Sequence, residues 1–200
     1  MLIKASSLIG LKIISLRKGE NLGEVNDVIY DPKNKKVRGL LLDEKGWFPE
    51  AKVIELKDIK NIGKDAVTVE SAKVIKKASE IPDPVAGVSP TTAKLKKMNL
   101  VTESGTNLGK IADFTFDPET GAVDEFEITQ GPIADLRYGR RQLAAADIIK
   151  VGVDNIIVAK SVEEKFKTQR EKTTEGITKE IQSTYERFRP GGGKKEKEEK

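Results

Sequence analysis

The stretch GENLGEVNDVIYDPKNKKV at residues 19–37 is answered by GTNLGKIADFTFDPETGAV at residues 105–123. At this constant offset of 86 positions, eight of the nineteen residues are identical. A second pair of similar stretches, residues 58–69 and 147–158, follows at an offset of 89, which places a three-residue insertion in the second copy. A repeat of this kind indicates that one structural unit of about 70 residues has been duplicated.

Each copy has the pattern of a small β domain. Short runs rich in Val, Ile, Leu and Phe alternate with turn signals, and this spacing is typical of five or six strands in a small barrel. In the first copy the runs are residues 11–16, 24–30, 37–43, 52–56 and 66–70. We therefore expect a mainly β protein made of two small β-barrels in tandem.

The positions shared by the two copies are mostly turn or bulge residues. In the second copy, Asp117 is placed to accept hydrogen bonds from the turn backbone, and Gly121 is free to take a positive φ. The first copy has Lys35 in place of Gly121, so we expect Asn34 to be the left-handed residue there. We assign structural roles in turns or bulges to Gly19, Gly23, Asp27, Asp31, Pro32, Gly105, Gly109, Asp113, Asp117 and Pro118.

One strand of each copy does not follow strict alternation. Its apolar positions are 22, 25, 28 and 30 in the first copy and 108, 111, 114 and 116 in the second. Either the strand is buried on both sides, or a β-bulge lies near residues 26–27 and 112–113. We favour the bulge. Asp27 and Asp113 would then hold turn backbone rather than perform acid or base chemistry.

Together these features resemble the PRC-barrel family. The resemblance rests on LIGLKI at residues 8–13, the doubled Gly-x-x-x-Gly-x-x-x-Asp-x-x-x-Asp-Pro spacing, the Gly-Trp-Phe loop and DIKNIGKDAVTV at residues 58–69. The chain looks most like stand-alone bacterial proteins with tandem PRC-barrel domains. The resemblance implies small β-barrels that act as docking modules, with no enzymatic activity of their own to carry over.

Composition divides the chain into five segments. Pro82, Pro84 and Pro90 interrupt any strand or helix between the copies, and charged residues replace β-branched ones after Lys160. We predict PRC-barrel-like domain 1 at residues 1–78, a Pro-rich linker at 79–92, PRC-barrel-like domain 2 at 93–160, an amphipathic helix at 161–189 and a disordered charged tail at 190–200.

The composition excludes much catalytic chemistry. The chain has 200 residues and neither Cys nor His, which removes thiolate nucleophiles, His general bases and the usual zinc sites. Its net charge of +4 is spread along the chain rather than gathered in a basic arm. No apolar stretch approaches the length of a membrane span, and no secretory signal is visible. We expect no catalytic residue, metal or cofactor, and a cytoplasmic protein, with peripheral membrane contact as an alternative.

The first candidate site is apolar. Trp47 and Phe48 stand side by side in a loop, and Leu41 is apolar where its counterpart in the second copy is Glu127. We propose Leu41, Trp47 and Phe48 as a candidate partner-binding surface. The alternative is that the linker, the other barrel or the C-terminal helix covers them.

The second candidate site is basic. Arg137, Tyr138, Arg140 and Arg141 form a predicted loop whose guanidinium groups and ring suit a phosphate or a nucleic-acid base. The alternative is a solvated loop in which one arginine pairs with Asp135.

The predicted C-terminal helix carries an apolar stripe that leaves its role open. Val162, Phe166, Ile177, Ile181 and Phe188 share this stripe, with a polar interval around Arg170. The helix either docks on the barrels or seeks a partner or a membrane. Our leading hypothesis is a non-enzymatic adaptor that docks protein partners; the alternatives are an RNA- or ribosome-associated factor that uses residues 137–141, and a peripheral membrane scaffold that uses this helix.

Overall fold

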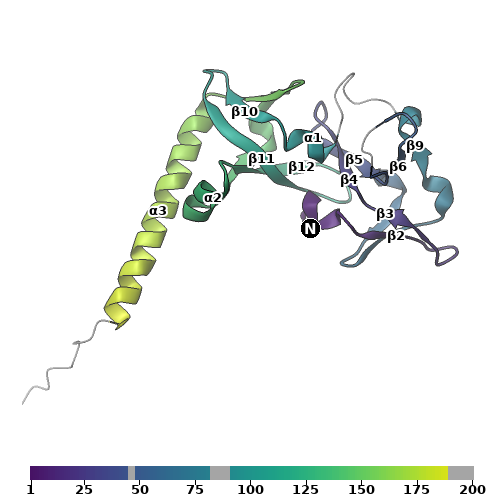
Figure 1. Ribbon diagram of the computed structural model, residues 1–200, viewed down its shortest axis with the longest axis horizontal. Helices are drawn as coiled ribbons and strands as arrows, with labels where there is room; N and C mark the ends of the chain where they lie inside the picture. The colour runs from purple at the N-terminus through teal and green to yellow at the C-terminus, as the bar shows by residue number, and fades with distance from the viewer. Residues whose placement is uncertain (45–47, 82–90, 189–200) are drawn as a thin grey trace, which may run out of the picture.

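A computed structural model describes residues 1–44, 48–81 and 91–188. The mainly β fold predicted from the repeat is confirmed, and a long C-terminal helix extends from one end of the molecule (Figure 1). The predicted linker lies partly, and the charged tail wholly, outside the described residues.

The first copy contains nine short strands and four 3-10 turns within its described residues. They are β1 (Ile3–Lys4), η1 (Ala5–Leu8), β2 (Lys12–Ser15), β3 (Asn21–Glu24), β4 (Asp27–Asp31), β5 (Lys36–Leu41), β6 (Lys52–Glu55), η2 (Leu56–Asp58), β7 (Ile59–Ile62), β8 (Ala66–Val69), η3 (Ala72–Val74), β9 (Lys76–Lys77) and η4 (Ala78–Glu80).

The second copy repeats this order with fewer breaks and adds helices. Its elements are α1 (Thr92–Leu95), β10 (Asn99–Thr102), β11 (Asn107–Phe116), β12 (Val123–Thr129), α2 (Pro132–Tyr138), β13 (Arg141–Ala144), η5 (Ala145–Asp147), β14 (Ile148–Val151), β15 (Asn155–Val158) and α3 (Ser161–Phe188).

The strands form three sheets. The first copy provides the sheets β3-β2-β8-β7 and β4-β5-β6-β9, whereas the second copy forms the sheet β13-β12-β11-β10-β15-β14. Each copy contains a parallel pair, β2 with β8 in the first copy and β10 with β15 in the second. Within the described residues, no sheet closes on itself as a hydrogen-bonded ring.

The irregular strand behaves differently in the two copies. In the second copy β11 runs continuously, with a register shift between Ile111 and Asp113, which is the bulge that we expected. In the first copy the chain breaks between β3 and β4 instead. All five residues of β4 are buried. Burial on both sides, the explanation that we did not favour, therefore applies to the first copy.

The turn after this strand corrects one expectation. Lys35, and not Asn34, takes the left-handed conformation, with φ of 52° against 72° for its counterpart Gly121. Asn34 instead donates its side-chain amide to Asp31. The expectation was wrong because it ignored this bond, which holds Asn34 inside the turn.

One hydrophobic core draws on both copies. Tyr30 of β4 lies against Phe114 and Phe126 of the second copy, with ring centroids 5.8 Å apart in each pair. Strand β1 at the start of the first copy pairs with β11 of the second. The two copies therefore share a core rather than packing as independent domains.

Helix α3 is docked at its beginning and projects at its end (Figure 1). Val162 and Phe166 are buried in the shared core. The side-chain amide of Gln169 accepts from the backbone N–H of Gln142 at 3.3 Å and donates to its carbonyl oxygen at 3.0 Å, so the helix covers part of the free edge of β13. Farther along, Ile181 and Tyr185 are exposed.

Candidate interaction surfaces

Leu41 and Glu127 occupy equivalent positions on the outer faces of their sheets. Leu41 lies opposite Asp27 and Val53, and Glu127 lies opposite Asp113 and Gln142. The backbone pairing is thus the same in both copies. The side chains that cover the two faces differ.

In the first copy this face is covered by a separate apolar cluster. Leu41 is only 1% exposed. The cluster consists of Ile29, Leu41, Ala51, Val53, Ala78 and Ile81. The interpretation of Leu41 as a partner-facing side chain was therefore wrong, because the chain itself buries it. Ile81 belongs to the predicted linker, which was one of the alternatives.

The rest of the predicted apolar surface is divided. Phe48 is partly buried and packs against the same cluster. Trp47 lies outside the described residues. Phe48 and Trp47 remain candidates for a partner-binding surface.

In the second copy the equivalent face is ionic. Glu127 is buried and accepts hydrogen bonds from Lys4 of β1 and, at 3.0 Å, from Arg140. Burial by itself raises the pKa of Glu127, but the hydrogen bonds from Lys4 and Arg140 and their charges outweigh it, so the pKa lies below its ordinary value. This carboxylate holds the N-terminal segment of the first copy and the arginine that follows α2.

Two of the three predicted anion-binding arginines make internal contacts. Arg140 pairs with Glu127 and also lies 3.6 Å from Asp135, the partner that the alternative named. Arg141 donates to Gln130 at 2.5 Å and lies over the ring of Phe166. Both side chains hold the second copy together.

The other two residues of this site belong to a helix, not to a loop. Helix α2 includes Arg137 and Tyr138 because Pro132 begins it and Gly139 ends it with a positive φ. The predicted loop was wrong at this point. Helix formation brings Ile133, Leu136 and Arg137 onto one face, since residues three and four positions apart are neighbours on a helix.

Sequence reasoning missed Arg170 as a part of the site. Its guanidinium group stacks over Tyr138 at 4.2 Å and donates to the phenol oxygen at 2.9 Å. The guanidinium of Arg137 lies 5.3 Å from the same ring. The hydrogen bond from Arg170, aided by the charge of Arg137, lowers the pKa of Tyr138. The signal in the sequence was the polar interval in the stripe of α3.

These residues surround a groove between α2 and α3, two helices that lie beside each other in Figure 1. The groove has a volume of about 420 Å³ and is lined by Arg137, Tyr138, Arg170, Thr174 and Thr178. On α2, Ile133 is 86% and Leu136 is 91% exposed. We call Ile133, Leu136, Arg137, Tyr138 and Arg170 the α2–α3 surface.

The comparison with known families agrees with the repeat. The PRC-barrel domain model matches residues 1–75 and 91–165. The chain belongs to the PRC-barrel family. PRC-barrel domains are protein-interaction modules and are generally non-catalytic. A comparison with curated proteins gives no match.

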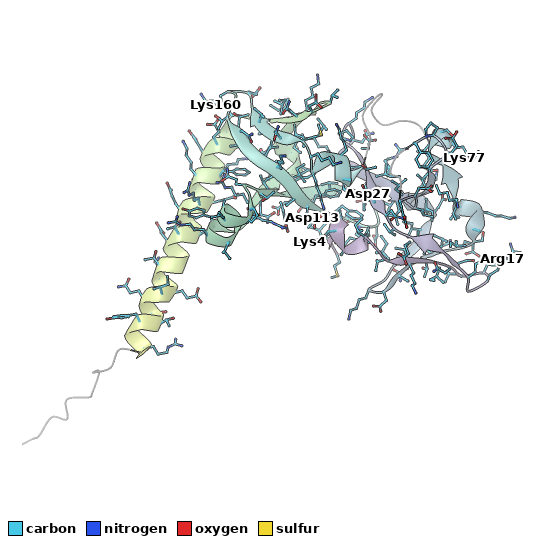
Figure 2. The ribbon with its side chains drawn as sticks, in the orientation of Figure 1. Lys4, Arg17, Asp27, Lys77, Asp113 and Lys160 are labelled. Carbon is cyan, nitrogen blue, oxygen red and sulfur yellow. The ribbon has the colours of Figure 1, made fainter. Side chains whose placement is uncertain are left out.

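In each PRC-barrel copy, an aspartate caps the first helical turn of the other copy. Asp27 accepts from the backbone N–H groups of Thr92 and Ala93 at 3.2 and 3.0 Å and from the Thr92 hydroxyl. Asp113 accepts from the backbone N–H of Ser6 at 3.1 Å and from its hydroxyl. Figure 2 shows Asp113 and Lys4 close together where the N-terminal segment meets the second copy. Each aspartate thus caps the turn that begins the other PRC-barrel copy.

This capping leaves the paired aspartates little scope for acid or base chemistry, because their oxygens are occupied by donors. Among the described residues of this PRC-barrel chain, no group of three or more His, Cys, Asp or Glu side chains could hold a metal ion. The described helices include none that is long and apolar enough to cross a membrane.

Proposed function

We propose that this protein is a non-enzymatic adaptor that docks a protein partner on the α2–α3 surface. The observation that carries the proposal is the pair Ile133 and Leu136, two aliphatic side chains almost fully exposed on one short helix. Arg137 shares their face of α2, and its guanidinium and that of Arg170 both lie against the ring of Tyr138. Aromatic and arginine side chains are enriched at the centres of protein interfaces, where neighbouring apolar groups exclude water.

An RNA- or ribosome-associated role through residues 137–141 has less support. Binding to RNA requires several cations that are free to neutralise phosphates. Arg140 is paired with Glu127, and Arg141 is partly buried against Phe166. Arg137 and Arg170 alone make a short stripe, and exposed aliphatic groups add nothing to a phosphate contact.

A peripheral membrane role is supported by one observation only. Ile181 and Tyr185 are exposed one turn apart on the projecting end of α3. Strong binding to anionic lipid needs Lys and Arg along the polar face of such a helix, whereas residues 161–189 carry similar numbers of acidic and basic side chains.

The test is a quantitative purification of the full chain from cells that naturally express it. The Ile133→Ala/Leu136→Ala variant is compared with the wild type and with Leu16→Ala/Arg17→Ala. This control removes an exposed aliphatic residue and an exposed arginine at the far end of the molecule from α3 (Figure 2). We expect at least one protein to copurify and to fall about tenfold with the α2 variant alone. Copurification of RNA alone, or of no protein above background, would contradict the proposal.

A further inference from the structure

We propose that the α2–α3 surface binds an acidic segment of a partner protein. Carboxylate side chains of this segment contact Arg137 and Arg170, and aliphatic side chains next to them contact Ile133 and Leu136. The inference rests on the proposed function, because it names the chemistry of the partner that the adaptor docks.

The first support is unpaired positive charge. Among the described residues, no carboxylate lies within ion-pair distance of Arg137 or Arg170, whereas Arg140 and Arg38 each have such a partner. Both unpaired guanidinium groups lie against the ring of Tyr138 and line the same groove. An anion placed in the groove would form charge-assisted hydrogen bonds with them.

The second support is that the cation is held in place before a partner arrives. Arg170 is fixed by its stacking on Tyr138 and by its hydrogen bond to the phenol oxygen. A pre-positioned guanidinium loses less conformational entropy on binding than a free one. The hydroxyl groups of Thr174 and Thr178 already donate to carbonyl oxygens of their own helix at 2.9 Å. The groove therefore offers guanidinium donors, which suit an anionic acceptor.

The third support is the neighbouring apolar area, which decides the class of partner. Ile133 and Leu136 share the exposed face of α2 with Arg137. A carboxylate flanked by aliphatic side chains matches both parts of this surface, and a polypeptide can present that combination. A nucleic acid would match only the two arginines. The adjoining hollow on α3 carries Glu171 and Glu175 beside Lys167 and Arg170, so the unpaired positive charge is confined to a small area, which suits a short peptide segment better than the extended surface of an anionic bilayer.

The experiment begins with selection of peptides by the intact chain. The immobilised full-length protein is used to select from a phage library of random peptides, with the Arg137→Ala/Arg170→Ala variant as the counter-selection. We expect the enriched peptides to combine two or more Asp or Glu residues with Leu, Ile or Val. The most enriched peptide is then synthesised and its dissociation constant is measured by fluorescence anisotropy.

The variants locate the site. Arg137→Ala/Arg170→Ala and Ile133→Ala/Leu136→Ala should each weaken the binding of this peptide by about tenfold or more, and added salt should weaken binding to the wild type. Leu16→Ala/Arg17→Ala should leave the affinity within about twofold of the wild type. Because Arg170 contacts Tyr138, thermal melts must show that each variant folds. Arg137→Glu provides a second test, since among the described residues the Arg137 side chain makes no ion pair and no hydrogen bond whose loss would unfold the protein, and its ring contact is with Tyr138.

Each other outcome contradicts the inference in a distinguishable way. If the enriched peptides lack acidic residues, or lose affinity only in Leu16→Ala/Arg17→Ala, the surface or its chemistry is wrong while the adaptor function stands. The same holds if no peptide is enriched but proteins still copurify with the chain. If an oligouridine RNA or phosphatidylglycerol vesicles bind through Arg137 and Arg170 and no peptide does, the class of partner is wrong. The adaptor function fails only if the purification from cells also returns no protein.

Discussion

The outer faces of the two copies have the same pattern of strand pairing, but one face is apolar and the other is ionic. At equivalent positions, Leu41 is buried among aliphatic side chains, whereas Glu127 holds Lys4 and Arg140. The inner faces, in contrast, remain apolar in both copies, as in Leu40 and Phe126. The inner face therefore maintains the fold. The outer face differs between the copies and determines what packs against each one.

The largest expected effect comes from exchanging the two outer residues. Leu41→Glu places a carboxylate among aliphatic side chains that offer no donor, and we expect it to lower the free energy of unfolding by about 3–5 kcal/mol. Glu127→Leu should cost less, about 1–2 kcal/mol, because Lys4 and Arg140 are half exposed and can be hydrated when their partner is removed. Urea denaturation of the two variants measures both values. Equal losses would show that the two faces do not differ as their burial implies.

The second prediction concerns Asp27 and Asp113, each of which caps a helical turn of the other copy. Asp27→Ala should lower the free energy of unfolding by about 2–4 kcal/mol, because it leaves donors of the buried Thr92 without an acceptor. Asp113→Ala should cost about 1–2 kcal/mol, since Ser6 is exposed and water can replace the carboxylate.

Urea denaturation followed by both tryptophan fluorescence and circular dichroism would test this prediction. Because the copies share one core, both variants should unfold in a single transition. Two separate transitions, with only one copy destabilised, would contradict the conclusion that each aspartate stabilises the other copy.

The sequence predicted what depends on local pattern. The doubled motif predicted the tandem β domains, and the loss of alternation around Ala112 and Asp113 predicted the bulge in β11. It could not reveal that Asp27 caps a turn of the other copy, because the partner Thr92 is 65 positions away and no local rule links them. Leu41 was misjudged for the same reason, since Ala78 and Ile81 cover it from a distant segment.

The candidate site was predicted in part. Arg137 and Tyr138 were recognised from composition alone, but the free and the paired arginines of residues 137–141 are indistinguishable in the sequence. Glu127, which lies on strand β12, forms an ion pair with Arg140. Arg170 joins the site only because α3 docks beside α2. A polar interval in an apolar stripe is a usable signal for such a contact.

The third prediction concerns the pH dependence of the ionic face. The pKa of Glu127 is lower in the folded state than its ordinary value of 4.5. Its contribution to stability is therefore fully present above the unfolded pKa and is lost as the pH falls through the folded pKa. Glu127→Gln should be less stable than the wild type by about 1–2 kcal/mol at neutral pH. The difference should shrink as the pH is lowered below about 4.5.

Urea denaturation at a series of pH values measures this difference. Leu41→Met is the control from the other face, since it introduces no titratable group and its difference from the wild type should not vary with pH. A constant difference between Glu127→Gln and the wild type across the series would show that the ion pairs with Lys4 and Arg140 contribute nothing.

The smallest effect is expected at the turn where the copies differ by one glycine. Lys35 has a φ of 52°, a conformation that costs a residue with a side chain about 1 kcal/mol. Replacement by glycine removes this cost but adds backbone entropy to the unfolded chain, so Lys35→Gly should stabilise the protein by at most about 0.5 kcal/mol. Gly121→Ala should do the opposite by a larger amount, because the added Cβ would lie 2.5 Å from the carbonyl oxygen of Val37. Thermal melts of the two variants should therefore shift in opposite directions, and a shift in the same direction would mean that the two turns do not share one backbone conformation.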